Sequence, residues 1–150
     1  VILADARGAD ARDRLLGAVQ QAETFAACRI AVLAERAHVY FELPDGCEHA
    51  LRFAHMDVRA RATARSAAPS LVAPDGTAWV QLVDAAHDPE LHALLLAVGV
   101  RSGAPLLALS DFHLRGQPLV RSEADALDAF RRSALDLLFV ETRLYERSSG

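Results

Sequence analysis

The chain has 150 residues, of which 52% are apolar and 24% charged, and its formal net charge is −4. This length suits one domain with a single core, and the composition argues against disorder. The acidic balance gives no reason to expect nucleic acid as a partner, and no apolar run approaches the roughly 20 residues that span a bilayer. The two cysteines have no CxxC spacing, which predicts reduced thiols in a cytoplasmic protein.

The first predicted element is a helix that begins near Asp10. Apolar residues then recur at helical spacing, and the acidic residue near the first turn favours the positive end of a helix; these apolar positions are Leu15, Leu16, Val19, and Ala22 or Ala26. The apolar run at 29–34 has the length of a strand. A helix followed by a strand is therefore expected in the first 34 residues.

Two copies of one turn sequence dominate the middle of the chain. Pro-Asp-Gly occurs at 44–46 and again at 74–76 between apolar runs, and this order of residues predicts a tight reversal. Alternating residues at 36–43 predict a strand that pairs with 47–54. Segments 70–73 and 77–84 would form the second hairpin. The two hairpins predict an antiparallel meander.

A change of parity follows the first hairpin. Apolar residues occupy odd positions before Asp57 and even positions after it, which predicts a bulge or turn near 55–57. The strand expected beyond that point carries an arginine row on one side, formed by Arg59, Arg61 and Arg65. Such a row is either a solvated face or an anion site, because guanidinium groups bind carboxylates through two hydrogen bonds.

Helix signals return after the sheet. Asp88-Pro89-Glu90 predicts an N-cap, a proline at the first helical position and an acidic first turn, with the end of the helix at Gly99 or Gly103. Residues 105–116 permit a short helix, with a strand over 106–109 as the competing interpretation. A capping-box sequence at 122–125 predicts another helix, and 137–140 is expected to be a strand.

Signatures of catalysis are mostly absent from the sequence. There is no glycine-rich phosphate loop, GxSxG elbow or HExxH motif. Asp111-x-His113 resembles the first motif of metallophosphoesterases, but the later motifs that such an enzyme needs are missing. His113 could instead be an axial ligand of haem iron, or simply a packed or exposed side chain.

Several short segments, taken together and in order, resemble the HemS/ChuS (HemS/ChuX-like) family of haem-trafficking and haem-degrading proteins. Residues 36–42 resemble a strand of that family, 56–59 its Asp-Leu-Arg segment, and 69–78 its Ser-Leu hairpin. Residues 109–113 resemble its Leu-Thr-Asp-x-His helix, and 138–140 the strand that opens its second repeat. The agreement covers nearly the whole chain, although each motif is short.

This resemblance implies an α+β fold in which an antiparallel meander is flanked by helices. Residues 1–104 would form a first HemS-like repeat (helix, antiparallel sheet, helix). Residues 105–150 would form a linker helix with the candidate ligand and the start of a second repeat, all in one compact unit. The resemblance also implies haem as cofactor, with His113 as the iron ligand and Arg59 as a haem contact. Arg61 is a further candidate.

The function implied is haem binding in bacterial haem uptake, as trafficking or as oxygen-dependent degradation. Partners would be an electron donor and a haem transporter, and a homodimer is expected. The alternative is a non-enzymatic partner-binding domain, such as a secretion-chaperone-like α/β protein, in which His113 has no role. Under both interpretations we expect no nucleic-acid partner and no membrane-spanning segment.

Overall fold

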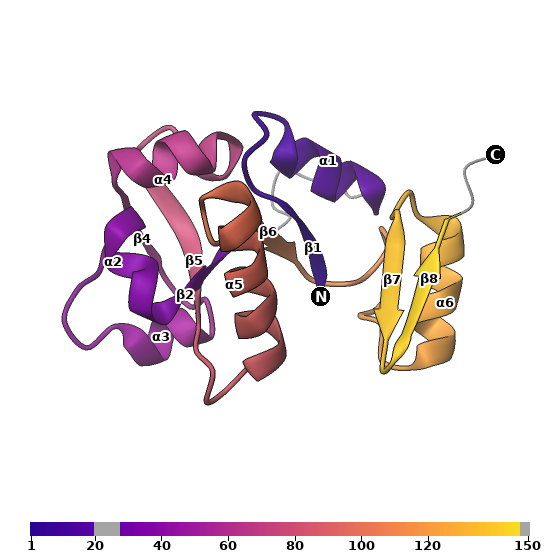
Figure 1. The fold of residues 1–150 in the computed structure, drawn as a ribbon. Helices are drawn as coiled ribbons and strands as arrows, with labels where there is room; N and C mark the ends of the chain where they lie inside the picture. The colour runs from indigo at the N-terminus through magenta and orange to yellow at the C-terminus, as the bar shows by residue number, and fades with distance from the viewer. Residues whose placement is uncertain (20–27, 148–150) are drawn as a thin grey trace.

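A computed structural model describes residues 1–19 and 28–147. Its described part is a mixed α+β fold (Figure 1). The strands are β1 (Ile2–Asp5), β2 (Arg29–Leu33), β3 (Phe41–Glu42), β4 (Asp57–Ala60), β5 (Thr77–Val83), β6 (Leu106–Ser110), β7 (Leu137–Val140) and β8 (Arg143–Glu146). The helices are α1 (Ala11–Ala18), α2 (Ala37–Tyr40), α3 (Glu48–Arg52), α4 (Ala62–Ala67), α5 (Pro89–Ser102) and α6 (Glu123–Arg132), with 3-10 turns η1 (Ala34–Arg36) and η2 (Pro69–Leu71).

Six strands form one mixed sheet in the order β1-β6-β2-β5-β4-β3. β2 and β5 are parallel, with Ile30 opposite Val80, and the other neighbours in the sheet are antiparallel. The predicted α+β class and the flanking helices are confirmed, but the purely antiparallel meander is wrong. The parallel pair needs a long crossover between its strands, and residues 34–76 supply it.

Helices cover both faces of this sheet. On one face, Leu91 and Leu95 of α5 pack against side chains of β2, β5 and β6. On the other face, α1 places Leu15 in a larger core that also includes Ile30 and Val80. Strand residues buried on both faces explain why β2 and β6 read as continuous apolar runs.

The two longest helices were predicted from their ends. The Asp88 carboxylate accepts a hydrogen bond from the Leu91 N–H at 3.0 Å, and α5 ends at Gly103, whose φ is +79°. The capping box of α6 is present, because the Ser122 hydroxyl and the Asp125 carboxylate each accept a backbone N–H bond at 3.1 Å. Both predicted helices are confirmed, as are α1 and the strands β2, β5 and β7. Positions 22 and 26, proposed for the first helix, lie outside the described residues.

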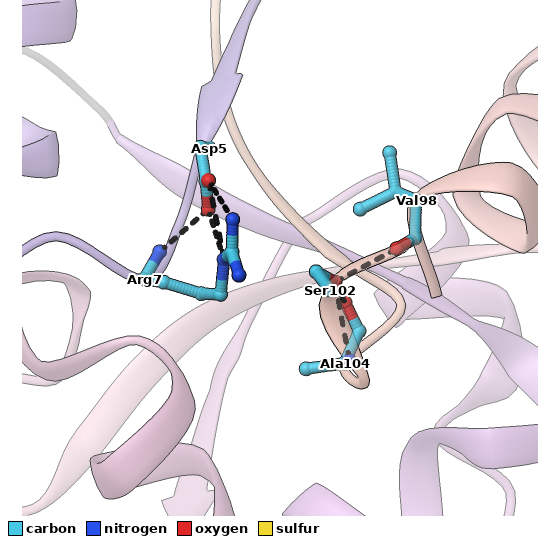
Figure 2. A network of polar contacts seen from close by, with 5 residues as sticks. All are labelled: Asp5, Arg7, Val98, Ser102 and Ala104. Atoms are coloured by element: carbon cyan, nitrogen blue, oxygen red, sulfur yellow. Dashed lines mark hydrogen bonds and ion pairs between the residues drawn. The ribbon is translucent and has the colours of Figure 1, made fainter. Parts of the chain in front are cut away.

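Figure 2 shows the polar contacts near the end of β1 and the end of α5. The Asp5 carboxylate accepts hydrogen bonds from the Arg7 guanidinium, the shortest at 2.6 Å, directly after β1. The Ser102 hydroxyl donates to the Val98 carbonyl at 2.8 Å and accepts from the Ala104 N–H at 3.2 Å. The Ser102 contacts fix the chain where α5 ends and leads into β6.

The stretch from 36 to 65 differs most from expectation. Most of the strand predicted at 36–43 is η1 and α2, the strand predicted at 47–54 is α3, and the arginine strand stops at Ala60, where α4 soon begins. The first Pro-Asp-Gly turn forms, with Gly46 at φ +73°, but it joins β3 to α3. Ala37 and Tyr40 are both buried. Their separation of three positions is the spacing of one helix face, whereas the strand prediction rests on a spacing of two.

The last elements lie apart from the six-stranded sheet in Figure 1. β7 and β8 pair in an antiparallel hairpin, and Leu138 of β7 packs on Ala126 and Phe130 of α6. Residues 106–110 form a strand, so the helix considered for 105–116 is wrong there. The division into units 1–104 and 105–150 stays a prediction. No helix of the described residues is long and apolar enough to cross a membrane.

Candidate functional site

An open cavity of about 720 Å³ lies beside the first residues of β5. We call it the Trp79 cavity, after the residue at its rim. The segment before β4, the start of β5, the loop after η2, Cys28 and the first turn of α1 enclose it. Its polar lining residues are Arg12, His55, Asp57, Ser70, Thr77 and Trp79.

Ser70 joins two walls of the Trp79 cavity. Its hydroxyl accepts a hydrogen bond from the Arg12 N–H at 3.3 Å and donates to the Gly8 carbonyl at 3.1 Å. This pair of bonds attaches the start of α1 to η2. The hydrogen bond from the Arg12 N–H to Ser70 therefore keeps Arg12 at the cavity.

Trp79 is fixed on the opposite wall. Its indole N–H donates to the Ala54 carbonyl at 2.6 Å, and its side chain is 41% exposed. The next residue along, His55, stacks near the Phe53 ring at 5.9 Å between centroids. Trp79 and His55 thus both line this wall of the cavity, and Trp79 stays partly exposed.

Cys28 lines the same cavity, and its thiol is partly buried. Burial raises the pKa of the Cys28 thiol to about 11, although the nearby positive charge of Arg12 favours the thiolate. The thiol therefore stays protonated at neutral pH, and only the thiolate attacks carbonyl carbon efficiently. A binding role, with no covalent step at sulfur, fits this side of the cavity.

Two more guanidinium groups converge on the turn that forms the cavity's outer wall. At Gly76, whose φ is +85°, an added Cβ would stand 3.0 Å from Arg65 Nη2 and 3.9 Å from Arg59 Nη1. Arg59 lies directly opposite Thr77 in the β4–β5 pairing, and Thr77 lines the cavity. Hydrogen bonds from the Thr77 N–H and hydroxyl, at 2.9 and 2.8 Å, lower the pKa of Asp75, and Arg59 adds to this effect.

The structure places His113 apart from Arg59 and Arg61, the other two residues predicted as haem contacts. Arg61 follows β4, where its Nε donates to the Phe41 carbonyl at 3.2 Å. His113 lies in the loop after β6, with Nδ1 3.4 Å from the Leu114 carbonyl. β2 and β5 lie between β4 and β6 in the sheet. At a spacing of about 4.8 Å per strand, Arg59 and the end of β6 are roughly 14 Å apart across the sheet.

Sequence reasoning missed most of the Trp79 cavity. Arg12 and Trp79 are 67 positions apart, and only the fold brings them to one cavity. The one local signal was the second Pro-Asp-Gly turn, which forms as predicted with the Gly76 N–H donating to the Ala73 carbonyl at 2.9 Å. Within the described residues, no group of three or more His, Cys, Asp or Glu side chains could hold a metal ion.

Fold and site define an α+β domain with a polar, arginine-bearing cavity beside the β4–β5 pair. Residues 1–147 match the family described as Carbamoyltransferase C-terminus. The chain belongs to this family.

Curated relatives agree with that family. The chain is 33% identical over 139 residues to the nodulation protein NolO of Bradyrhizobium diazoefficiens, covering 93% of this chain and 25% of that protein. It is 32% identical over 149 residues to the nodulation protein NolNO of Sinorhizobium fredii, covering 99% and 22%. An uncharacterised protein of Methanocaldococcus jannaschii is 28% identical over 97% of this chain and 23% of that protein. The chain thus spans about a quarter of the length of these relatives.

This family overturns the haem interpretation. The chain belongs to a carbamoyltransferase family and not to a HemS/ChuX-like one. The prediction of haem as cofactor is therefore wrong, and so is haem transport or degradation as the function. The predicted partners, an electron donor and a haem transporter, are wrong for the same reason. The secretion-chaperone alternative is also unsupported. The resemblance misled because its segments are short: residues 106–110 of the supposed ligand helix region are a strand, and Pro69–Leu71 of the supposed hairpin is a 3-10 turn.

Proposed function

We propose that the chain is the C-terminal part of a carbamoyltransferase and that the Trp79 cavity binds the carbamoyl donor. The observation that carries this proposal is the family match over residues 1–147. The cavity supports it, since a positively charged group lies in a space large enough for a small molecule. The acceptor and the rest of the reaction belong to the longer protein.

Carbamoyl transfer places a definite demand on such a site. A nucleophile of the acceptor attacks the carbamoyl carbon, the bond from that carbon to the leaving group breaks, and the leaving group departs with the electron pair. A guanidinium group that neutralises the developing negative charge makes this departure easier. We assign this role to Arg12. We propose that the Asp57 carboxylate accepts hydrogen bonds from the N–H groups of the donor's amide.

Arg59 and Arg65 supply further positive charge beside Gly76, in the turn whose residues Ala73 and Pro74 line the cavity. Both guanidinium groups lie within 4 Å of the position a Cβ would take at Gly76. Two like charges this close favour an anion between or beside them. We propose that they attract an anionic donor toward the cavity, and that Arg59 is an anion contact in this function.

A transfer assay on the full-length protein tests the proposal. Carbamoyl phosphate, which joins a carbamoyl group to an anionic leaving group, is supplied with a ¹⁴C label, and the release of phosphate and the transfer of label to candidate acceptors are followed. Arg12→Ala should lower kcat/KM roughly 10- to 100-fold, the cost of losing a charged hydrogen bond that forms to the leaving group in the transition state. Arg101→Ala, on the exposed end of α5, is the matched control. Equal kinetics for both variants would refute the role of Arg12.

Location in the cell is a proposal as well. Cys28 and Cys47 are both free, which fits the reducing cytoplasm expected from their spacing.

A further inference from the structure

The hairpin β7–β8 has one covered and one uncovered face. Leu138 is 7% exposed and packs on α6. Its neighbours along β7, Leu137 and Phe139, point the other way and are 56% and 65% exposed, and Leu144, opposite Phe139 on β8, is 56% exposed. We call Leu137, Phe139 and Leu144 the hairpin face. An antiparallel sheet covered on one side normally has polar residues on the other.

The hairpin face belongs to a firmly attached element. The Arg147 guanidinium, just after β8, donates to the Phe130 carbonyl at 2.7 Å and lies over the Phe130 ring, 5.4 Å from its centroid. The Arg147 N–H donates to the Asp136 carbonyl at 3.0 Å, which extends the strand pairing past Glu146. These contacts attach the end of β8 to α6 and to the start of β7.

The size of the hairpin face indicates what covers it. Three large side chains at these exposures present on the order of 300 Å² of apolar surface. Two free proteins need about 800 Å² from each partner for a stable complex. A segment of the same polypeptide needs far less, because the linkage gives it an effective concentration near the millimolar range.

The relatives show that such a segment exists in proteins of this family. The chain spans 25% of NolO and 22% of NolNO, and the matching family is described as the C-terminus of a carbamoyltransferase. We infer that the hairpin face is the contact through which this part packs against the preceding part of its own carbamoyltransferase chain. This inference rests on the proposed function for the existence of that preceding part.

Thiol labelling of the full-length protein tests the contact. Phe139→Cys and Leu144→Cys are compared with Val100→Cys, which lies on α5 and is 89% exposed. Maleimide labelling is followed under native conditions by mass spectrometry of the modified peptides. The inference predicts labelling at 139 and 144 at least tenfold slower than at 100, at every protein concentration. Equal rates overturn it, and so does protection that appears only as the protein dimerises, since a second copy would then cover the face.

Hydroxyl-radical footprinting of the unsubstituted full-length protein gives a second readout. Phe139 and Phe53 are the same residue type with similar exposure in the described structure, 65% and 54%. Oxidation of Phe139 should be several-fold slower than that of Phe53, and faster or equal oxidation contradicts the contact. The carbamoyl transfer assay is separate: transfer with an unprotected face refutes this contact alone, and protection without transfer refutes the proposed function alone.

Discussion

Replacing Gly76 by alanine perturbs the backbone and the arginine pair together. Gly76 has φ +85°, a conformation that L side chains rarely adopt, and the new Cβ would stand 3.0 Å from Arg65 Nη2. Gly46 provides the matched control. It occupies the first copy of the same turn at φ +73°, and an added Cβ there would have no atom within 4 Å.

The two substitutions should cost similar stability. A left-handed conformation costs a residue with a side chain about 1–2 kcal/mol, and this cost applies to both glycines. The additional contact at Gly76 is with the end of a flexible arginine, which can rotate away at little cost. We therefore expect each variant to lose about 1–2 kcal/mol in the free energy of unfolding.

Function should separate the two variants. Rotation of Arg65 away from Gly76 disturbs the arginine pair beside the turn whose residues Ala73 and Pro74 line the Trp79 cavity. Gly76→Ala should therefore raise KM for carbamoyl phosphate several-fold, and Gly46→Ala should leave it unchanged. Urea unfolding and the transfer assay on the full-length protein measure the two effects. A Gly46→Ala variant as stable as the parent would refute the backbone argument. Equal KM values would refute the role of Arg65.

Further predictions concern the core and the response to pH. Leu95→Ala should lower the free energy of unfolding by about 2–5 kcal/mol, because this side chain is fully buried between α5 and the sheet; Val100→Ala on the same helix should change it by less than about 0.5 kcal/mol, and similar losses in urea unfolding would contradict this packing. Hydrogen bonds from His87 and Arg52 lower the pKa of Asp84 to about 2. Because this folded pKa lies below the unfolded value, the stabilisation by Asp84 is complete above about pH 4 and disappears as the pH falls toward 2. The difference in stability between the parent and Asp84→Asn should therefore shrink between about pH 4 and 2, and a constant difference would refute this linkage.

Local residue chemistry made the ends of the two long helices predictable. Asp88 and Ser122 cap α5 and α6 through bonds that reach only three residues along the chain, so the sequence contains the whole interaction. The two Pro-Asp-Gly turns are local in the same sense. Such caps and turns depend on residues that are close in the sequence, so the rest of the fold changes them little.

The order of strands depended on contacts that no local pattern encodes. The β2–β5 pairing joins Ile30 to Val80, fifty positions apart, and makes the sheet mixed. Between them, the alternation at 36–43 predicts a strand, but Ala37 and Tyr40 are buried on α2. Beyond Ala60 the chain forms α4, with Ala64 buried. The Trp79 cavity follows from that folding. The sequence predicts Arg59 and Arg61 as haem contacts and Arg65 as part of the same arginine row, whereas no local pattern singles out Arg12.

Titration of the full-length protein with carbamoyl phosphate, followed by tryptophan fluorescence, tests the central claim most directly. Trp79 is the single tryptophan of this chain and lines the cavity, and Trp79→Phe identifies its share of the signal. The account predicts a saturable change that Trp79→Phe abolishes and that Arg12→Ala shifts to at least tenfold higher concentration. A signal from Trp79 that does not respond to carbamoyl phosphate, or that responds equally in Arg12→Ala, would contradict it.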